Sequence, residues 1–272
     1  LEYLAKRIDS QALREALAAR DYASMARYSG TKVIHISERD TQVERISRQP
    51  SEFLNTWSPA GLREESLAFS ECTWGVHESE LPPDAMHLDF EGKFHLCIKR
   101  PAVFTPIRSW VPDSPIIGML IPHGETFTIG NRLTVIEEGS LIYRPTVCFV
   151  YRPSPQALES LLEFRSGKLD SYIDRLISCN VLSGSDNLGA LIMGEHGSFW
   201  FGSRLSIEQT RALLGQRHNA TVLQVASSLL GAVFWMMKNP KCGLCLPGDL
   251  PSQEVLDVAA MYLGQPELHE SN

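Results

Sequence analysis

The chain has 272 residues, of which 43% are hydrophobic, and it carries a formal net charge of -7 at pH 7. Such a composition predicts a soluble globular protein with a sizeable core, built as one large domain or two ordinary ones. The acidic balance argues against nucleic acid or an anionic membrane as the main partner, because both reward clustered Lys and Arg, and cationic small molecules fit better.

A helix is predicted over residues 1–28, which are rich in Ala, Leu and Arg. Asp9 or Ser10 is a possible internal cap, and Gly30 is a plausible end. The chain opens directly in this helical pattern without a methionine, so we expect it to be a piece of a longer protein.

A short strand follows over residues 32–37, where apolar and polar residues alternate. Glu38, Arg39 and Asp40 come directly after it. In a parallel sheet, ligands bind at this end of a strand. The alternative for such a triplet is a solvated turn, in which the ion pair contributes little.

Trp57 stands beside loop residues, and Ser58, Pro59 and then the acids Glu64 and Glu65 follow it. A tryptophan in such a place is usually part of the core. Its flat π face can instead hold a cation, an interaction of roughly 0.5 to 2 kcal/mol.

Several more strands are predicted in the first half of the chain, and their succession indicates an α+β protein with a mixed or antiparallel sheet and flanking helices. They are a hairpin over residues 86–98 that turns at Glu91 and Gly92, a strand over 101–111, and strands over 132–137 and 144–151 around a turn at 138–139.

The most informative stretch is an apolar run over residues 116–121 that stops at Pro122, which cannot donate to a sheet ladder. His123 and Glu125 follow, with one residue between them. If the backbone stays extended, both side chains leave it on the same face and share one site. If residues 126–135 form a helix instead, Glu125 lies in its first turn, where the helix dipole favours the charged carboxylate.

After residue 151 the pattern becomes helical, with Ser154 as a cap of a helix to residue 164 and a second amphipathic segment over 169–177. A polar turn over residues 183–189 contains Asp186, which is predicted to be a turn residue. The glycines of this turn have the wrong spacing for a dinucleotide-binding fingerprint. A hairpin is expected next, formed by residues 190–193 and 198–201.

Helices are also predicted towards the C-terminus, where Ser206 and Gln209 form a capping box and Ser252 caps the last helix. The apolar run over residues 220–237 is interrupted by polar residues, which favours a buried core helix over a membrane span. No signal peptide is visible.

The six cysteines are scattered, which suits a reducing compartment better than a disulfide scaffold. Cys242 and Cys245 form a lone CxxC that lacks the four donors of a zinc site and the preceding strand of a redox motif. No metal site is therefore predicted.

Eight segments together resemble the bacterial homospermidine synthases, which are relatives of saccharopine dehydrogenase and carboxynorspermidine dehydrogenase. They follow one another in the expected order, nearly from end to end. The segments are VIHISERDTQ (33–42), FLNTWS (53–58), WGVHE (74–78), GMLIPHGE (118–125), YRPTV (143–147), DNLGALIMG (186–194), FWFGSRLS (199–206) and NATVLQVASSLLGAVFW (219–235).

The resemblance implies NAD-dependent chemistry on diamines in the cytoplasm. In this family one putrescine is oxidised to an imine, ammonia is lost, a second putrescine condenses, and the Schiff base takes the hydride back. Carried over by position, the expected catalytic residues are His123, Glu38, Glu65 and Glu125, and the expected substrate-binding residues are Trp57, Asp186, Glu38 and Glu65.

These residue types suit a diamine. Primary amines are protonated near neutral pH, with a pKa of roughly 10, so their site needs negative charge to hold them and a group that moves protons. The four acids would supply the charge, Trp57 a cation-holding π face, and His123 a proton carrier. Carboxylates crowded into one cavity raise one another's pKa values unless cations occupy it.

The chain departs from the family in one respect, because it has no GxGxxG in a βαβ context, whereas a homospermidine synthase begins with a Rossmann domain. We therefore expect the C-terminal portion of such an enzyme, which would form homodimers, bind NAD poorly and be inactive alone. Residues 1–205 would form the substrate-binding and dimerisation domain, and residues 206–272 the helices that pack on the missing domain.

Two alternatives remain open. One is a carboxynorspermidine- or saccharopine-type reductase, whose amino acid substrate needs a cationic residue for its carboxylate. The other is an amine-binding or dimerising protein without catalytic activity.

Overall fold

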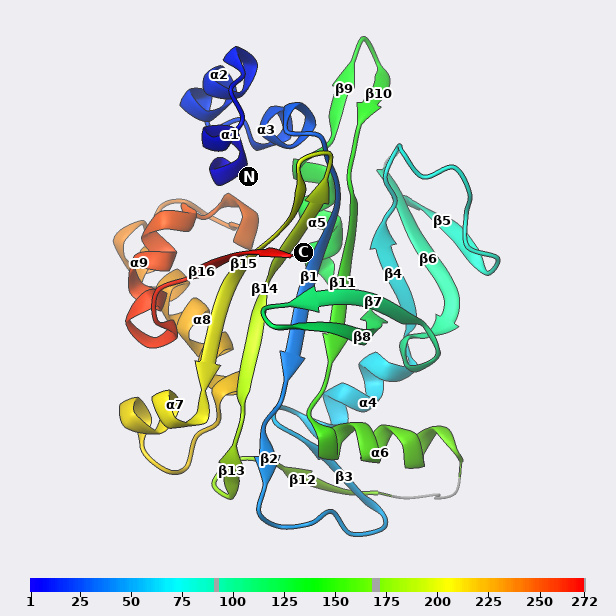
Figure 1. The fold of residues 1–272 in the computed structure, drawn as a ribbon, viewed down its shortest axis with the longest axis vertical. Coiled ribbons are helices and arrows are strands. Elements are labelled where there is room, and N and C mark those ends of the chain that lie inside the picture. Colours follow the sequence, from blue (N-terminus) through cyan, green and yellow to red (C-terminus); the bar gives the residue numbers. More distant parts are fainter. Residues whose placement is uncertain (91–92, 168–171, 272) are drawn as a thin grey trace.

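A mixed sheet forms the centre of the computed structural model, which describes residues 1–90, 93–167 and 172–271 (Figure 1). β1 and β11 pair in parallel, and the other neighbours in the sheet are antiparallel. From edge to edge the strands are β16 (Glu267–Ser271), β15 (Gly197–Ser206), β14 (Ser185–Gly194), β1 (Thr31–Asp40), β11 (Thr146–Arg152), β4 (Phe69–Thr73), β6 (Lys93–Pro101) and β5 (Ala85–Phe90). The predicted α+β class with a mixed sheet is confirmed.

Shorter strands pair beside this sheet. The hairpin of β7 (Pro106–Val111) and β8 (Ser114–Ile121) joins it through β8 and β11. The three small sheets are β9 (Val135–Glu137) with β10 (Ser140–Tyr143), β3 (Glu52–Asn55) with β12 (Ile173–Leu176), and β2 (Val43–Glu44) with β13 (Val181–Ser183).

The helices lie around the sheet, with α8 and α9 beside β14, β15 and β16 and with α4 and α6 near the far ends of β1 and β11 (Figure 1). Their bounds are α1 (Glu2–Arg7), α2 (Gln11–Ala19), α3 (Tyr22–Tyr28), α4 (Pro59–Leu67), α5 (Gly124–Arg132), α6 (Pro155–Arg165), α7 (Ile207–Leu214), α8 (Ala220–Lys238) and α9 (Ser252–Leu263), with short 3-10 turns at Ala102–Phe104 and Pro247–Asp249.

The single helix predicted over residues 1–28 is wrong, because local caps divide the segment into three. Ser10 caps α2, as predicted, by accepting a hydrogen bond from the Leu13 amide. Arg20 then takes a left-handed conformation, with φ of 53°, and Asp21 caps α3. Side chains that bond to nearby backbone amides compete with helix continuation.

The region around residue 177 also differs from the prediction. Residues 173–176 form β12, which pairs in parallel with β3, rather than part of an amphipathic helix. The start of that predicted segment, at 168–171, lies outside the described residues, as does the turn expected at Glu91 and Gly92. Four residues are too few for a helical period to be told from a strand period.

Three other strand predictions need correction. The strand expected over residues 101–111 is interrupted by the 3-10 turn, and only β7 remains of it. The strand expected over 132–137 shrinks to β9, because α5 runs to Arg132. The segment 32–37 extends to β1, so that Glu38 and Asp40 are part of the strand.

The predicted caps of α6 and α7 are confirmed. Ser154 accepts a hydrogen bond from the Ala157 amide at the start of α6, where Pro155 holds the first helical position. Ser206 and Gln209 form the reciprocal capping box of α7. The boundary proposed between two domains near residue 205 falls between β15 and α7 and stays a prediction.

Helix α8 is only partly a core helix, contrary to the prediction. Leu223 packs with Ala220 and Leu205, whereas Val225, Leu229 and Met237 on other sides are 62%, 64% and 73% exposed. By length and composition α8 could cross a membrane, a test that core helices of soluble proteins also pass. The apolar content of residues 220–237 therefore did not reveal which side of α8 packs against the rest of the chain.

Candidate active site

Acidic side chains gather at the carboxyl end of β1, where the parallel pairing with β11 ends. Glu38 and Asp40 project from the same face of β1, because side chains alternate along a strand. Glu38 is in register with Tyr151 of β11, and Asp40 is in register with Asp186 of β14. Three neighbouring strands thus bring three carboxyl groups and a phenol to one place.

Asp186 is the least satisfied of these acids. It is fully buried, and neither carboxylate oxygen has a hydrogen-bond partner of ordinary geometry among the described residues. Burial, followed by the charge of Asp40, raises the pKa of Asp186 to about 8. Asp186 lies in strand β14 and not in a turn, so the turn prediction was wrong.

Glu38 stands in the same environment. It is 8% exposed, and burial together with the charges of Asp186, Asp40 and Glu65 raises the pKa of its carboxyl well above the ordinary range. Several acids that raise one another's pKa are the arrangement expected of a site that becomes ionised when a cation enters.

Asp40 differs from its neighbours because four hydrogen bonds reach it. Thr56 Oγ1 donates at 2.6 Å, the Gln42 amide nitrogen at 2.7 Å, Gln42 Nε2 at 3.1 Å and Thr221 Oγ1 at 3.4 Å. Burial raises the pKa of Asp40, and these bonds oppose that effect. They also link β1 to the loop before Trp57 and to the first turn of α8.

Trp57 is joined to these acids by its hydrogen bond to Tyr151. Its indole Nε1 donates to the Tyr151 hydroxyl at 3.0 Å, and the two ring centroids are 6.3 Å apart. Tyr151 is 1% exposed, and burial, then the charges of Glu38, Asp40 and Asp186, raises the pKa of its hydroxyl. The phenol therefore keeps its proton.

His123 lies between two carboxylates. Its Nδ1 is 3.1 Å from Glu125 Oε2, and its Nε2 is 3.5 Å from Glu65 Oε1. Burial favours the neutral imidazole, but the bonds to Glu125 and Glu65 outweigh it and raise the pKa of His123 to about 9. The imidazole ring also packs on Phe149, with centroids 4.4 Å apart.

Helix α5 places this histidine. His123 occupies its N-cap position with an extended backbone and makes no side-chain cap, so its ring is available to the acids. The helical alternative is confirmed, with bounds Gly124–Arg132, and the extended alternative is wrong. Glu125 lies in the first turn, and its bond to His123 lowers the pKa of its carboxyl.

The structure thus brings the six predicted site residues into one network. Glu65 bridges its two halves, because it contacts His123 and its charge acts on Glu38. Its second oxygen, Oε2, is buried without a hydrogen-bond partner in the described part of the chain. Within residues 1–90, 93–167 and 172–271, no group of three or more His, Cys, Asp or Glu side chains is arranged to hold a metal ion.

Comparison with known proteins places the chain in a family. The model of the saccharopine dehydrogenase C-terminal domain matches residues 10–265. The chain belongs to that family. The predicted likeness to homospermidine synthases is also confirmed.

Two curated homospermidine synthases are similar to the chain. That of Blastochloris viridis is 37% identical over 255 residues, which cover 92% of this chain and 53% of the relative. That of Mesorhizobium japonicum is 34% identical over 248 residues, which cover 89% and 51%. The chain therefore spans about half the length of the curated relatives it matches.

A solved structure shows the same fold in a longer protein. It is the crystal structure of the homospermidine synthase from Legionella pneumophila in complex with NAD, with a TM-score of 0.89 and 34% identity. The match covers 99% of this chain and 61% of that one. The sheet and helices described above are thus those of this family.

The residues of this family member do not by themselves fit a dinucleotide. The chain has no GxGxxG, and β1, which has a parallel neighbour, is followed by Thr41 and β2 rather than by a glycine-rich turn and a helix. The groups that crowd the site are carboxylates, which do not suit a pyrophosphate. We therefore assign no residue of the chain to NAD.

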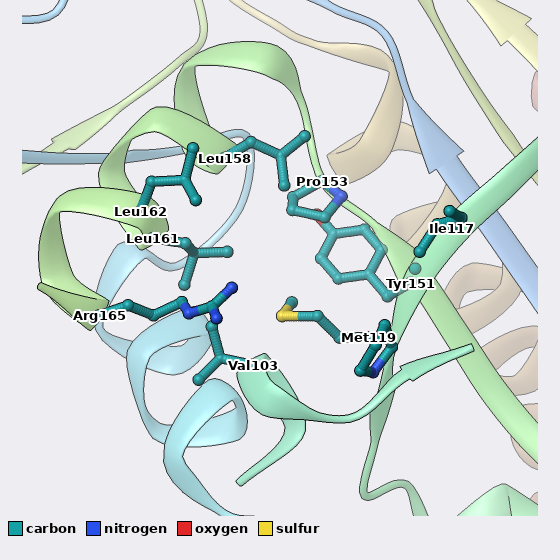
Figure 2. Close-up of a pocket in the computed structure, with 11 residues that line it drawn as sticks. Val103, Ile117, Met119, Tyr151, Pro153, Leu158, Leu161, Leu162 and Arg165 are labelled. Carbon is teal, nitrogen blue, oxygen red and sulfur yellow. The ribbon is translucent and has the colours of Figure 1, made fainter. Parts of the chain in front are cut away.

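An apolar cavity of about 130 Å³ adjoins the network (Figure 2). The Tyr151 ring lies between Pro153 and Met119 at its wall, while Leu161 and Arg165 come from α6. Tyr151 lines this cavity and also belongs to the acidic network described above. Its ring therefore lies between the apolar space and the carboxyl groups.

Sequence reasoning missed the roles of Tyr151, Gln42 and Thr221. Tyr151 was only the end of an apolar strand, and Thr221 only a polar interruption in an apolar helix. A polar residue within such a run signals that a buried partner exists. The sequence does not identify that partner, because Thr221 contacts Asp40, which is 181 residues away in the chain.

Proposed function

We propose that the chain forms the catalytic, amine-binding part of an NAD-dependent homospermidine synthase, which converts two putrescine molecules to homospermidine and ammonia. The acidic network around Glu38, Asp186 and Glu65 carries this proposal, because its buried oxygens lack partners that a dication would supply. The protein is expected to act as a homodimer in the cytoplasm. Bound NAD would supply hydride transfer.

Charge is the first argument for a diamine. The largest influences on the pKa values of Glu38 and Asp186 are burial and other carboxylates, and no cation is among them. A buried carboxylate needs an opposite charge or enough hydrogen bonds to stay ionised. When an ammonium group binds, Glu38 and Asp186 ionise and release protons, and the new charge pair compensates their desolvation.

Proton transfer is the second argument. With a pKa of about 9, His123 is an imidazolium at neutral pH, so it serves as the acid that donates a proton to the leaving ammonia. The base that accepts a proton from the reacting ammonium is a carboxylate of raised pKa, and we propose Glu38 for this role because burial and three neighbouring acids raise its pKa. This divides the predicted roles of His123 and Glu38 into donor and acceptor.

A carboxynorspermidine- or saccharopine-type reductase is the alternative. The substrates of such a reductase carry a carboxylate. The acids around Glu38 and Asp186 would repel that carboxylate. The network therefore favours a substrate with ammonium groups at both ends. A non-catalytic amine-binding protein would use the same charges and differ only in lacking turnover.

Calorimetry with putrescine at pH 7 tests the proposal. We expect putrescine to bind about 10-fold or more tightly than butylamine, with 1,4-butanediol as an uncharged control of the same length. Titration in two buffers of different ionisation enthalpy should show proton release on binding. Equal binding of butanediol and putrescine, or the absence of proton release, would contradict the proposed site.

Two neighbouring acids of α4 give a matched pair of variants. Glu65→Gln removes a charge beside His123 and is expected to weaken putrescine binding by about 10-fold. Glu64→Gln removes a charge from the exposed side of the same helix and should leave binding unchanged. If lysine, which carries a carboxylate, binds more tightly than putrescine, the reductase alternative gains support.

A further inference from the structure

Tyr151 is a buried polar residue for which the proposed reaction gives no role. Its ring packs with Phe53 and Met119 in the core beneath the sheet and lines the apolar cavity of Figure 2. Packing of a fully buried ring fixes its position. The hydroxyl at the tip of this ring is therefore also held at one place, at the carboxyl end of β11 beside Glu38.

The Tyr151 hydroxyl holds Trp57 by its indole N–H, at 3.0 Å. On its benzene edge the indole meets the first turn of α4, where a Cβ added to Gly61 would lie 2.8 Å from Trp57 Cζ3. Thr56, one residue before, is tied to Asp40 at 2.6 Å. The indole is thus fixed at its polar edge, at its apolar edge and through its backbone.

A fixed indole matters for a cation site. The attraction between a cation and a π face depends on the cation lying over the ring within about 6 Å of its centroid. An indole that can rotate offers its edge, whose electrostatic potential is positive, as readily as its face. Orientation of Trp57 is therefore part of the affinity for an ammonium group.

We propose that Tyr151 is a positioning residue of the amine site, which acts through its hydrogen bond to Trp57 and sets the plane of the indole against the bound ammonium. The inference rests on the proposed function for the identity of the ligand. It concerns a residue that acts on the amine through the indole that its hydroxyl holds.

The variant that tests it is Tyr151→Phe, which keeps the packed ring and removes only the hydroxyl. Tyr172→Phe is the matched control, since Tyr172 packs on the same Phe53 and its hydroxyl is buried without a hydrogen-bond partner in the described residues. Both variants should retain the fold. Only Tyr151→Phe leaves an indole N–H without its acceptor.

The first readout does not need an amine. In protein with 15N-labelled tryptophan, the Trp57 indole signal, assigned with Trp57→Phe, should shift in Tyr151→Phe and exchange faster with solvent, and it should be unchanged in Tyr172→Phe. An unchanged Trp57 signal in Tyr151→Phe would overturn the inference, whatever the protein binds.

The second readout is putrescine binding by calorimetry. Tyr151→Phe should raise the Kd about 3- to 10-fold, within the range of one cation–π contact. In a Trp57→Phe background the same substitution should have no further effect, because Tyr151 acts through Trp57. Additive effects of the two substitutions would overturn the inference. Failure of the parent chain to bind putrescine would refute the proposed function instead, and the indole signal would still decide whether Tyr151 orients Trp57.

Discussion

The two faces of β1 bury polar groups in opposite ways. On one face, His35 Nδ1 lies 3.0 Å from Ser109 Oγ, and Ser37 Oγ donates to the Trp110 carbonyl and accepts from Trp200 Nε1, each at 3.0 Å. On the other face, Asp186 and Glu65 keep buried oxygens without partners among the described residues. The polar groups named on the first face find partners inside the chain, whereas the two acids on the second face keep oxygens that the proposed ligand would satisfy.

Two histidines show the same contrast. His35 is 7% exposed, and burial lowers its pKa to about 4, so it is a neutral hydrogen-bonding group of the core. His123 is held by two carboxylates that raise its pKa to about 9. The same side chain is inert on one face of the sheet and charged on the other because only the second has acids beside it.

The largest expected effect on stability comes from Asp186→Asn, which replaces an acid on the face that keeps unpartnered oxygens among the described residues. The folded pKa of Asp186, about 8, lies above the 3.8 of an unfolded aspartate, so the protonated carboxyl favours folding at low pH and that stability is lost as pH rises towards 8. Asp186→Asn does not titrate. It should therefore match the parent near pH 4 and exceed its unfolding free energy by about 1 to 4 kcal/mol at pH 8, measured by urea unfolding.

Asp40→Asn is the control for that prediction. Two of the four donors bond to each carboxylate oxygen of Asp40, so in the variant two of them would meet an amide NH₂ group, and the variant should be less stable than the parent at both pH values. A stability difference between Asp186→Asn and the parent that stays constant from pH 4 to pH 8 would show that Asp186 is ionised in the fold.

The next effect concerns the satisfied face. Ser37→Ala removes the acceptor of the Trp200 indole and the donor to the Trp110 carbonyl, and it should cost about 1 to 3 kcal/mol in urea unfolding. Putrescine binding should stay unchanged. Ser114→Ala, at the start of β8, removes only an exposed hydroxyl bond to the Pro115 carbonyl and is the control with little expected cost. A weaker putrescine affinity in Ser37→Ala would mean that the two faces are not independent.

The smallest effect belongs to His123. Its folded pKa of about 9 lies above the 6.5 of an unfolded histidine, so its stabilisation is fully present below pH 6.5 and is lost as pH rises through 9. Its side chain is 29% exposed, and screening reduces the effect to about 1 to 2 kcal/mol. His123→Gln should lower the free energy of unfolding at pH 6 and match the parent near pH 10. The control His196→Gln, at an exposed position, should leave stability unchanged at both pH values. Equal losses in His123→Gln at both pH values would contradict a charged imidazolium at position 123.

Local chemistry made part of the fold predictable. Ser154 and Ser206 mark the starts of α6 and α7 because a cap depends on residues three positions apart. Asp186 was misplaced for the complementary reason. Flanking glycines and polar residues suggested a turn, but pairing with β1 and β15, set by distant residues, makes the segment a strand.

The site was predictable only as a set carried over from a resembling family. Spacing alone related His123 to Glu125, and nothing local related either to Glu65 or Glu38. Glu65 lies on α4, so its contact with His123 depends on how that helix packs. Strand register decides which acids share a face with Glu38, since a shift of one residue between β1 and β14 would turn Asp186 to the other face. Whether each residue has the role assigned by resemblance stays a prediction for the variants above.

The hydrogen bonds at the start of α8 join the acidic network to a distant surface. Asn219 Nδ2 donates to the Thr56 carbonyl at 2.6 Å, and the Ala220 amide donates to Gln42 Oε1 at 2.8 Å, beside the Asp40 contacts. A helix of 19 residues extends roughly 28 Å from that point. A shift of α8 along its axis would consequently lengthen the bonds that hold Asp40, and the pKa values of the acids would change with the motion of a helix end roughly 28 Å away.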